Sequence, residues 1–277
     1  SNFYVDLKHS AYLNYYFHVD SDLFLEIAEM NFDVFVLVAL VFVFAGGIKG
    51  LIGFGLPTVS IAILAAFLGL IEAMTLMLLP SLITNLLQGL VGGHLIRLIR
   101  RCWSLFILGA VFTWLTSSLL STWDPATFLV ILGVVITVYG LSSLWSFQLP
   151  SPGPGEPWIS PIVGMLSGGI TGLTGVFVVP SIGYLQALRM DRDELIQAMG
   201  LWFTIATLSL AFSLKEHGLL SDELGWLSLM AVLPALLGMW IGRILRPRLS
   251  EAAFRRLFFA GLTLLGVYIG ASTLVAG

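Results

Sequence analysis

The sequence has little charge for its length: of its 277 residues only 10% are charged, whereas 58% are hydrophobic. Soluble domains have about a quarter of their residues charged. A soluble core could not bury this much apolar surface, so the composition predicts an all-α, multi-pass protein embedded in a lipid bilayer. The net charge of −3 includes no basic block, and no nucleic-acid partner is expected.

Residues suited to catalysis or metal binding are also scarce. The single cysteine, Cys102, excludes an internal disulfide and a multi-cysteine metal site. The four histidines lack the spacing of metal ligands, and the carboxylates that flank the apolar segments form no intramembrane pair. We therefore expect no catalytic residue, no metal and no cofactor, and predict that the protein is not an enzyme. The same scarcity leaves proton or ion coupling without an obvious carrier.

Ten apolar segments are expected, five on each side of a Pro/Gly-rich linker with the sequence QLPSPGPGEP. The predicted organisation is an N-terminal segment (1–30), a first transmembrane repeat (31–147), the linker (148–158) and a second repeat (159–277). The first repeat holds segments 32–52, 57–70, 73–96, 104–120 and 127–147. The second holds a segment that starts at residue 159, followed by 180–188, 195–214, 224–245 and 253–275.

A glycine motif occurs once in each half: AGGIKGLIGFGLP at residues 45–57 and SGGITGLTGVFVVP at residues 167–180. Four glycines and two apolar residues match between the copies, which indicates an internal repeat. Each copy ends an apolar run and is followed by a proline and an undersized segment. We therefore expect a helix that is interrupted inside the membrane in each half.

An interrupted helix presents free N–H groups, and bilayers tolerate such groups only where they are buried in protein or line a polar cavity. A helix that restarts at Pro57 or Pro180 directs its positive end at the break, which favours anion binding. The alternative is that the glycines only permit close helix packing. The substrate-binding prediction comprises Lys49, Gly50, Gly53, Gly55, Pro57, Asn85, Gln88, Gly172, Thr174, Gly175, Pro180, Trp202 and Thr204.

Lys49 is the only charge deep within a predicted span, and an intramembrane base is functional by default unless it reaches the surface. Its counterpart in the second motif is Thr171. Asn85 and Gln88 lie three residues apart and share a helix face. Their amides suit the coordination of an oxyanion, although such side chains also serve as hydrogen bonds between helices.

The distribution of basic residues predicts the orientation. Three loops hold 10 of the 13 basic residues, namely Arg97, Arg100, Arg101, Arg189, Arg192, Arg243, Arg246, Arg248, Arg255 and Arg256. If every segment crosses, these loops lie on one side, which the positive-inside rule makes cytoplasmic. Equivalent loops of the two halves carry opposite bias, as inverted repeats would. The short segments 57–70 and 180–188 could instead be re-entrant, which would change the crossing count.

At the two glycine motifs the chain resembles the TauE/SafE family, also called the 4-toluene sulfonate uptake permease family. The resemblance covers about residues 35–275, and the second copy departs from the motif at Phe177, where the first has Gly55. It implies transport of a small sulfur-containing anion such as sulfite, a sulfonate or sulfoacetate. Together with the inverted repeats, we expect a secondary transporter of the bacterial inner membrane that works by alternating access. The substrate, the direction and the oligomeric state, monomer or homodimer, stay open. A passive anion channel and a non-transporting scaffold subunit are the alternatives.

The first 30 residues differ from the rest, because they are acidic and rich in tyrosine and contain no apolar run long enough to span a bilayer. They are neither a signal peptide nor a transmembrane helix. An extracytoplasmic or interfacial segment and an extension ahead of Met30 are both compatible with this composition.

Overall fold

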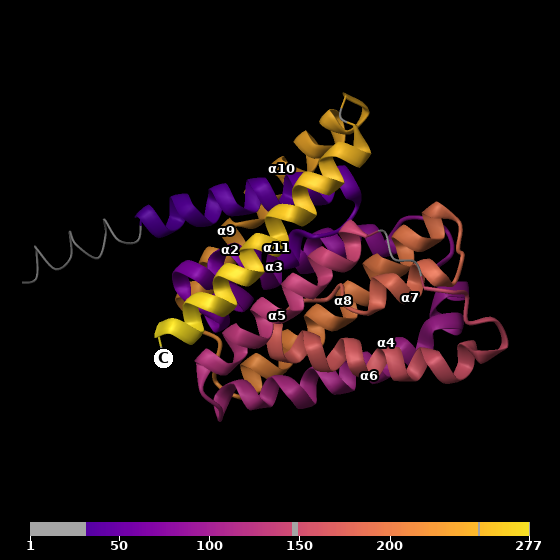
Figure 1. Ribbon diagram of the computed structural model, residues 1–277, viewed down its shortest axis with the longest axis horizontal. Coiled ribbons are helices and arrows are strands. Elements are labelled where there is room, and N and C mark those ends of the chain that lie inside the picture. The colour runs from indigo at the N-terminus through magenta and orange to yellow at the C-terminus, as the bar shows by residue number, and fades with distance from the viewer. Residues whose placement is uncertain (1–31, 146–148, 249, 277) are drawn as a thin grey trace, which may run out of the picture. The chain divides into compact units, whose positions relative to one another are not determined.

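The computed structural model describes residues 32–145, 149–248 and 250–276, and within these residues the chain is helical, with no strand (Figure 1). The predicted N-terminal segment 1–30 lies outside the described residues. The helices are Phe32–Ile52, α2 (Leu56–Leu68), α3 (Leu70–Leu90), α4 (Leu95–Ser117), α5 (Pro125–Leu144), α6 (Glu156–Thr174), α7 (Ser181–Ala187), α8 (Arg192–Glu216), α9 (Asp222–Met230), α10 (Val232–Leu245) and α11 (Glu251–Ala276). Three short 3-10 turns lie at Ser118–Ser121, Gly153–Gly155 and Arg246–Arg248.

Seven helices of the described residues are long and apolar enough to cross a membrane, counting Glu223–Arg248 as one. This confirms the predicted all-α membrane class. The two undersized segments are also present, as α2 with 13 residues and α7 with 7. A helix rises about 1.5 Å per residue, so neither reaches across a hydrocarbon core of about 30 Å by itself.

The sequence explains where several helices begin. Asp124 accepts a hydrogen bond from the Ala126 amide (3.1 Å) and caps α5, whose first residue is Pro125. These residue types are the ones favoured at the cap and first position of a helix. The predicted segment 224–245 is interrupted at Ala231, and α10 starts at the next residue. Pro234 lies two residues further on, and it has no amide to donate to the carbonyl four residues earlier, that of Met230, where α9 ends.

The boundary between the third and fourth segments differs from the prediction. We expected the third segment to run to Ile96, but α3 ends at Leu90 and α4 begins at Leu95. Gly92 and Gly93 separate the helices with φ values of 135° and 79°, a region that favours glycine. The arginines expected in a loop therefore belong to the first two turns of α4.

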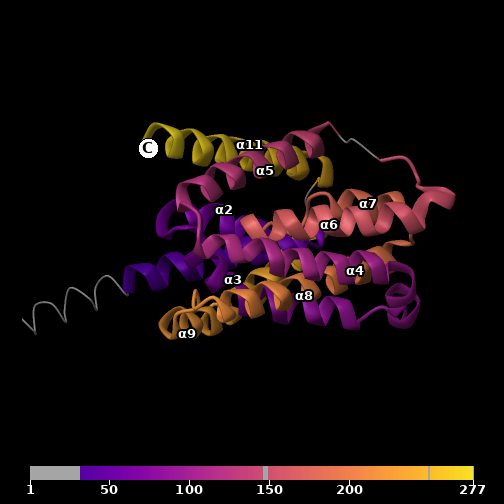
Figure 2. The ribbon, with the colours of Figure 1, turned by 90° about the horizontal axis from the view of Figure 1, so that it is seen from below.

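The helices pack in pairs that join the two halves of the sequence. α4 packs against α6 and α8, α3 packs against α8 and α9, and α5 packs against α11. Figure 1 shows α4 beside α6, and Figure 2 shows α5 beside α11. Gly46 and Gly50 of the first helix approach the backbone of Ala235 and Met239 in α10.

The directions of these helices follow from the contacts. α4 and α8 are parallel, because Arg97 pairs with Glu194 near their starts and Ser213 Oγ donates to the Trp114 carbonyl (3.2 Å) further along. α3 is antiparallel to both, since its C-terminal Gly89 carbonyl accepts from Gln197 Nε2 near the start of α8 (2.9 Å).

The remaining pairs can be oriented in the same way. Gly164 and Gly172 of α6 lie against Leu105 and Thr113 of α4, so these two helices are parallel. The successive contacts of Gly46 and Gly50 make the first helix parallel to α10. α5 and α11 are antiparallel, because Gly133 adjoins Gly266 and Gly140 adjoins Thr263.

Pro80 lies inside α3, where it leaves the Leu76 carbonyl without its helical donor. Ser228 of α9 replaces that donor: its Oγ donates to the Leu76 carbonyl (2.9 Å) and accepts from the Leu79 amide (3.2 Å). Ser228 is buried, so no water competes for the carbonyl. The proline thus creates a polar position that joins α3 to α9.

Candidate functional site

The first helix interruption spans residues 53–55. The last helical bond before it runs from the Gly53 amide to the Lys49 carbonyl (2.8 Å). Gly53 and Gly55 have φ values of 92° and 104°, so both occupy the region that favours glycine. Pro57 lies in the first turn of α2, and Gly55 offers no side chain to cap that turn. The first amides of α2 therefore have no partner from the helix itself.

The second interruption is longer and is held by side chains. α6 ends at Thr174, Gly175 has a φ of 68°, and helix resumes only at Ser181. Residues 175–178 are buried. Thr171 Oγ1 donates to the carbonyl of Val176 (3.2 Å), and Trp202 Nε1 donates to that of Phe177 (2.9 Å). These bonds satisfy backbone groups that lipid could not.

Lys49 lies one turn before the first interruption and is 3% exposed. Its Nζ donates to Thr84 Oγ1 (3.0 Å) and to Asn85 Oδ1, both on α3. Both partners are buried and neutral. Within the described residues no carboxylate pairs with Lys49. The ammonium group is therefore buried and lacks a counter-ion among those residues.

An unused hydrogen-bond donor accompanies Lys49. Asn85 Nδ2 is buried and has no hydrogen-bond partner among the described residues, while Oδ1 of the same side chain accepts from Lys49. A buried donor without a partner destabilises a fold by about 1–3 kcal/mol. Lys49 and Asn85 together offer a positive charge and a free donor, which are the groups that bind an oxyanion.

The sequence profile of the sulfite exporter TauE/SafE family matches residues 38–269, which include both interruptions and Lys49. The chain belongs to the TauE/SafE family. No curated protein and no solved structure matches the chain. The resemblance seen at the two glycine motifs is thereby confirmed over most of the chain. TauE/SafE proteins are transporters, which agrees with a chain of membrane-spanning helices.

The glycines of the two TauE/SafE motifs have two separate roles. A Cβ added at Gly50 would meet the backbone of Met239, Gly242 and Arg243 in α10. Gly172 is equally confined by the backbone of Thr113 in α4. These two positions permit close helix packing, as in small-xxx-small motifs. Gly53, Gly55 and Gly175 form the interruptions themselves.

Other residues of the substrate-binding prediction contact the protein backbone. Gln88 Nε2 donates to the Ile196 carbonyl of α8 (2.9 Å). Thr174 and Thr204 donate to carbonyls one turn earlier in their own helices, those of Ile170 and Gly200 (both 2.7 Å). Pro180 directly precedes α7, at the end of the second interruption. Trp202 is fully buried against Gly109 and holds the second interruption by its bond to the Phe177 carbonyl.

Lys49, next to the first interruption, and the second interruption contact different parts of α3. A Cβ at Gly175 would meet Met74, near the beginning of α3, and Ile61 of α2. Lys49 instead contacts Asn85, 11 residues further along the same helix and so about 16 Å away along its axis. The described contacts thus join Lys49 to α3, and they do not join it to the second interruption.

Three polar residues that organise this region were missed from the sequence. Gln197 binds both the Gly89 carbonyl and the His94 amide (2.9 Å each), Glu194 is buried beside Arg97, and Ser228 binds Leu76. The only signal for Ser228 was Pro80, which predicts a free carbonyl but not its partner. Within the described residues no three His, Cys, Asp or Glu side chains form a group that could hold a metal ion.

Proposed function

We propose that the protein is a secondary transporter that moves a small sulfur-containing anion, such as sulfite, a sulfonate or sulfoacetate, across the bacterial inner membrane. The observation that carries this proposal is Lys49, a buried base whose hydrogen-bond partners among the described residues are the neutral Thr84 and Asn85. A charge that leaves water without a counter-ion is strongly destabilised. A bound oxyanion supplies that counter-ion and accepts from the free amide of Asn85.

The directions of the helices support transport by alternating access between inverted repeats. The helices that correspond between the two halves run antiparallel: α3 against α8, and α5 against α11. Helices also pack across the two halves in an equivalent way. The first helix of the first half packs on α10 of the second half, and α6 of the second half packs on α4 of the first half. One half can then rock against the other around a fixed site. On this proposal the repeats are 31–147 and 159–277.

The central experiment measures binding and uptake of sulfite, thiosulfate, sulfate, taurine, sulfoacetate and isethionate, with the purified protein in micelles and in proteoliposomes. Lys49→Met removes the charge and retains an apolar chain of similar length. Lys215→Met is the matched control, because Lys215 is exposed at the end of α8. A hydrogen bond to a charged group contributes about 1.5–3 kcal/mol, so Lys49→Met should weaken anion binding about 10- to 100-fold.

Saturable uptake of one of these anions that is lost in Lys49→Met and retained in Lys215→Met supports the proposal. Equal affinity in Lys49→Met and the unsubstituted protein contradicts the assigned site. Flux that never saturates would identify a passive channel instead of a transporter.

A further inference from the structure

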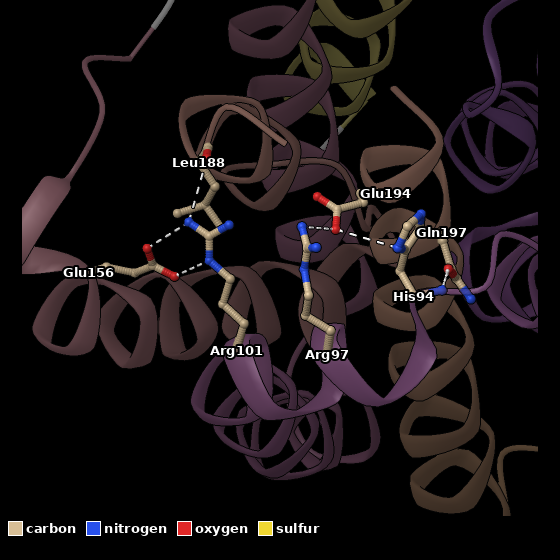
Figure 3. A network of polar contacts seen from close by, with 7 residues as sticks. All are labelled: His94, Arg97, Arg101, Glu156, Leu188, Glu194 and Gln197. Carbon is tan, nitrogen blue, oxygen red and sulfur yellow. Dashed lines mark hydrogen bonds and ion pairs between the residues drawn. The ribbon is translucent and has the colours of Figure 1, made fainter. Parts of the chain in front are cut away.

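A basic groove of about 800 Å³ lies where α3 ends and α4 begins. Its polar lining includes His94, Arg97, Arg100, Arg101 and Gln197, while Leu90 and Ile96 belong to its apolar lining. Figure 3 shows Arg97 and Arg101 extending from neighbouring turns of α4 toward two different carboxylates. The groove is separate from Lys49, which donates to Asn85 deeper within α3.

The charges of this groove are only partly balanced. Arg97 pairs with Glu194, and Arg101 makes two bonds with Glu156 (2.7 and 2.8 Å). Arg100 forms no ion pair with any residue that the structure describes. One arginine is thus left to bind an anion from outside the chain.

The start of α4 adds to this positive potential. No acidic residue lies in its first turn, and His94 provides no side-chain cap. A helix start carries about half a positive charge and presents free amides, so it repels the positive charge of Arg100, which no described carboxylate balances. A bound anion relieves that repulsion.

The apolar side of the groove identifies the kind of anion. Leu90 is 57% exposed and Ile96 is 67% exposed, and both line the groove beside the arginines. α4 begins the apolar helix Leu95–Ser121, which is long enough to cross a membrane, so the groove lies at one end of a candidate span. An inorganic anion would match the charge but not these apolar walls. A ligand with a phosphate head and an acyl chain matches both.

We propose that this groove binds an anionic phospholipid, with its headgroup phosphate on Arg100 and the start of α4, and its acyl chain along Ile96 and Leu90. The bound lipid steadies the turn between α3 and α4. Gln197 already links the two sides of that turn, through the Gly89 carbonyl and the His94 amide.

The test uses the full chain, delipidated in a neutral detergent, and titrates phosphatidylglycerol, phosphatidylcholine or inorganic phosphate while bound lipid is counted by native mass spectrometry. Arg100→Gln is the informative variant, because Arg100 is exposed and removing it breaks no ion pair of the described residues. Arg256→Gln is the matched control: Arg256 is an exposed arginine of α11 that does not line the groove.

The expected result is that phosphatidylglycerol binds at least five-fold more tightly than phosphatidylcholine, and that Arg100→Gln removes this preference while Arg256→Gln retains it. Equal binding of the two lipids overturns the proposal. So does an equal loss in both variants, which would indicate a diffuse electrostatic attraction. Occupancy by inorganic phosphate that displaces phosphatidylglycerol at similar concentration would assign the groove to a free anion and overturn the lipid assignment.

Discussion

Ser228→Ala tests how Pro80 is accommodated inside α3. The substitution removes the hydroxyl that donates to the Leu76 carbonyl at 2.9 Å, in a buried position where no water replaces it. Hydrogen bonds between transmembrane helices contribute about 0.6 kcal/mol on average and up to about 1.7 kcal/mol. Ser228 makes a second bond, to the Leu79 amide, so we expect a loss in the upper half of this range, about 1–1.7 kcal/mol.

The physical reason is tested by a double-mutant cycle with Pro80→Ala. Alanine restores an amide at position 80, and this amide can donate to the Leu76 carbonyl as in an ordinary helix. Ser228→Ala should therefore destabilise the Pro80→Ala background by less than half as much as the unsubstituted protein. Unfolding in mixed micelles, followed by circular dichroism, gives the four free energies.

Ser272→Ala is the control, because the Ser272 hydroxyl is exposed and bonds only to the Ile269 carbonyl of its own helix. It should change the free energy of unfolding by less than about 0.5 kcal/mol. The reasoning is refuted if Ser228→Ala has the same effect in both backgrounds, because Pro80 would then not be the cause of the contact.

Two further predictions concern the glycine motif and the second interruption. Gly168→Ala should lower the free energy of unfolding by about 1–3 kcal/mol, because the added Cβ would meet the Gly109 backbone. Gly261→Ala is the control and should be neutral or stabilising, because Gly261 faces open space on α11. Equal effects of the two substitutions would contradict the packing role of Gly168. Trp202→Phe should remove one of the two hydrogen bonds to the Phe177 carbonyl, leaving the one that Ser181 Oγ donates (2.6 Å). Hydrogen exchange within residues 175–180 should therefore increase while α4 stays protected, and unchanged exchange there would show that the Trp202 bond does not hold the interruption.

Several features could be predicted from the sequence because they depend on composition and local chemistry. The membrane class follows from the apolar content, and both interruptions follow from glycine and proline at fixed spacing. The family resemblance depended on the same two motifs and is confirmed over residues 38–269. Some boundaries were displaced: the predicted third segment continued through Gly92 and Gly93 to Ile96, whereas α3 ends at Leu90 and both glycines have a positive φ.

The candidate site could be predicted only in part. That Lys49 belongs to an apolar helix long enough to cross a membrane is a property of its position in an apolar run, and the sequence already singled it out. That its partners are Thr84 and Asn85, while Gln88 instead reaches the Ile196 carbonyl, depends on the rotation of α3 relative to its neighbours. Residues three apart share a helix face, yet which of them meets which neighbour depends on packing.

The division between the two roles of the glycines was likewise decided by tertiary structure. The sequence determined that glycine was needed at both Gly50 and Gly53, and local periodicity does not distinguish them. Gly50 lies where the α10 backbone leaves no room for a side chain, whereas Gly53 has nothing near its Cβ position and is required by its φ of 92°. The first constraint comes from a helix almost 200 residues away in the chain, and the second from the backbone of the residue itself.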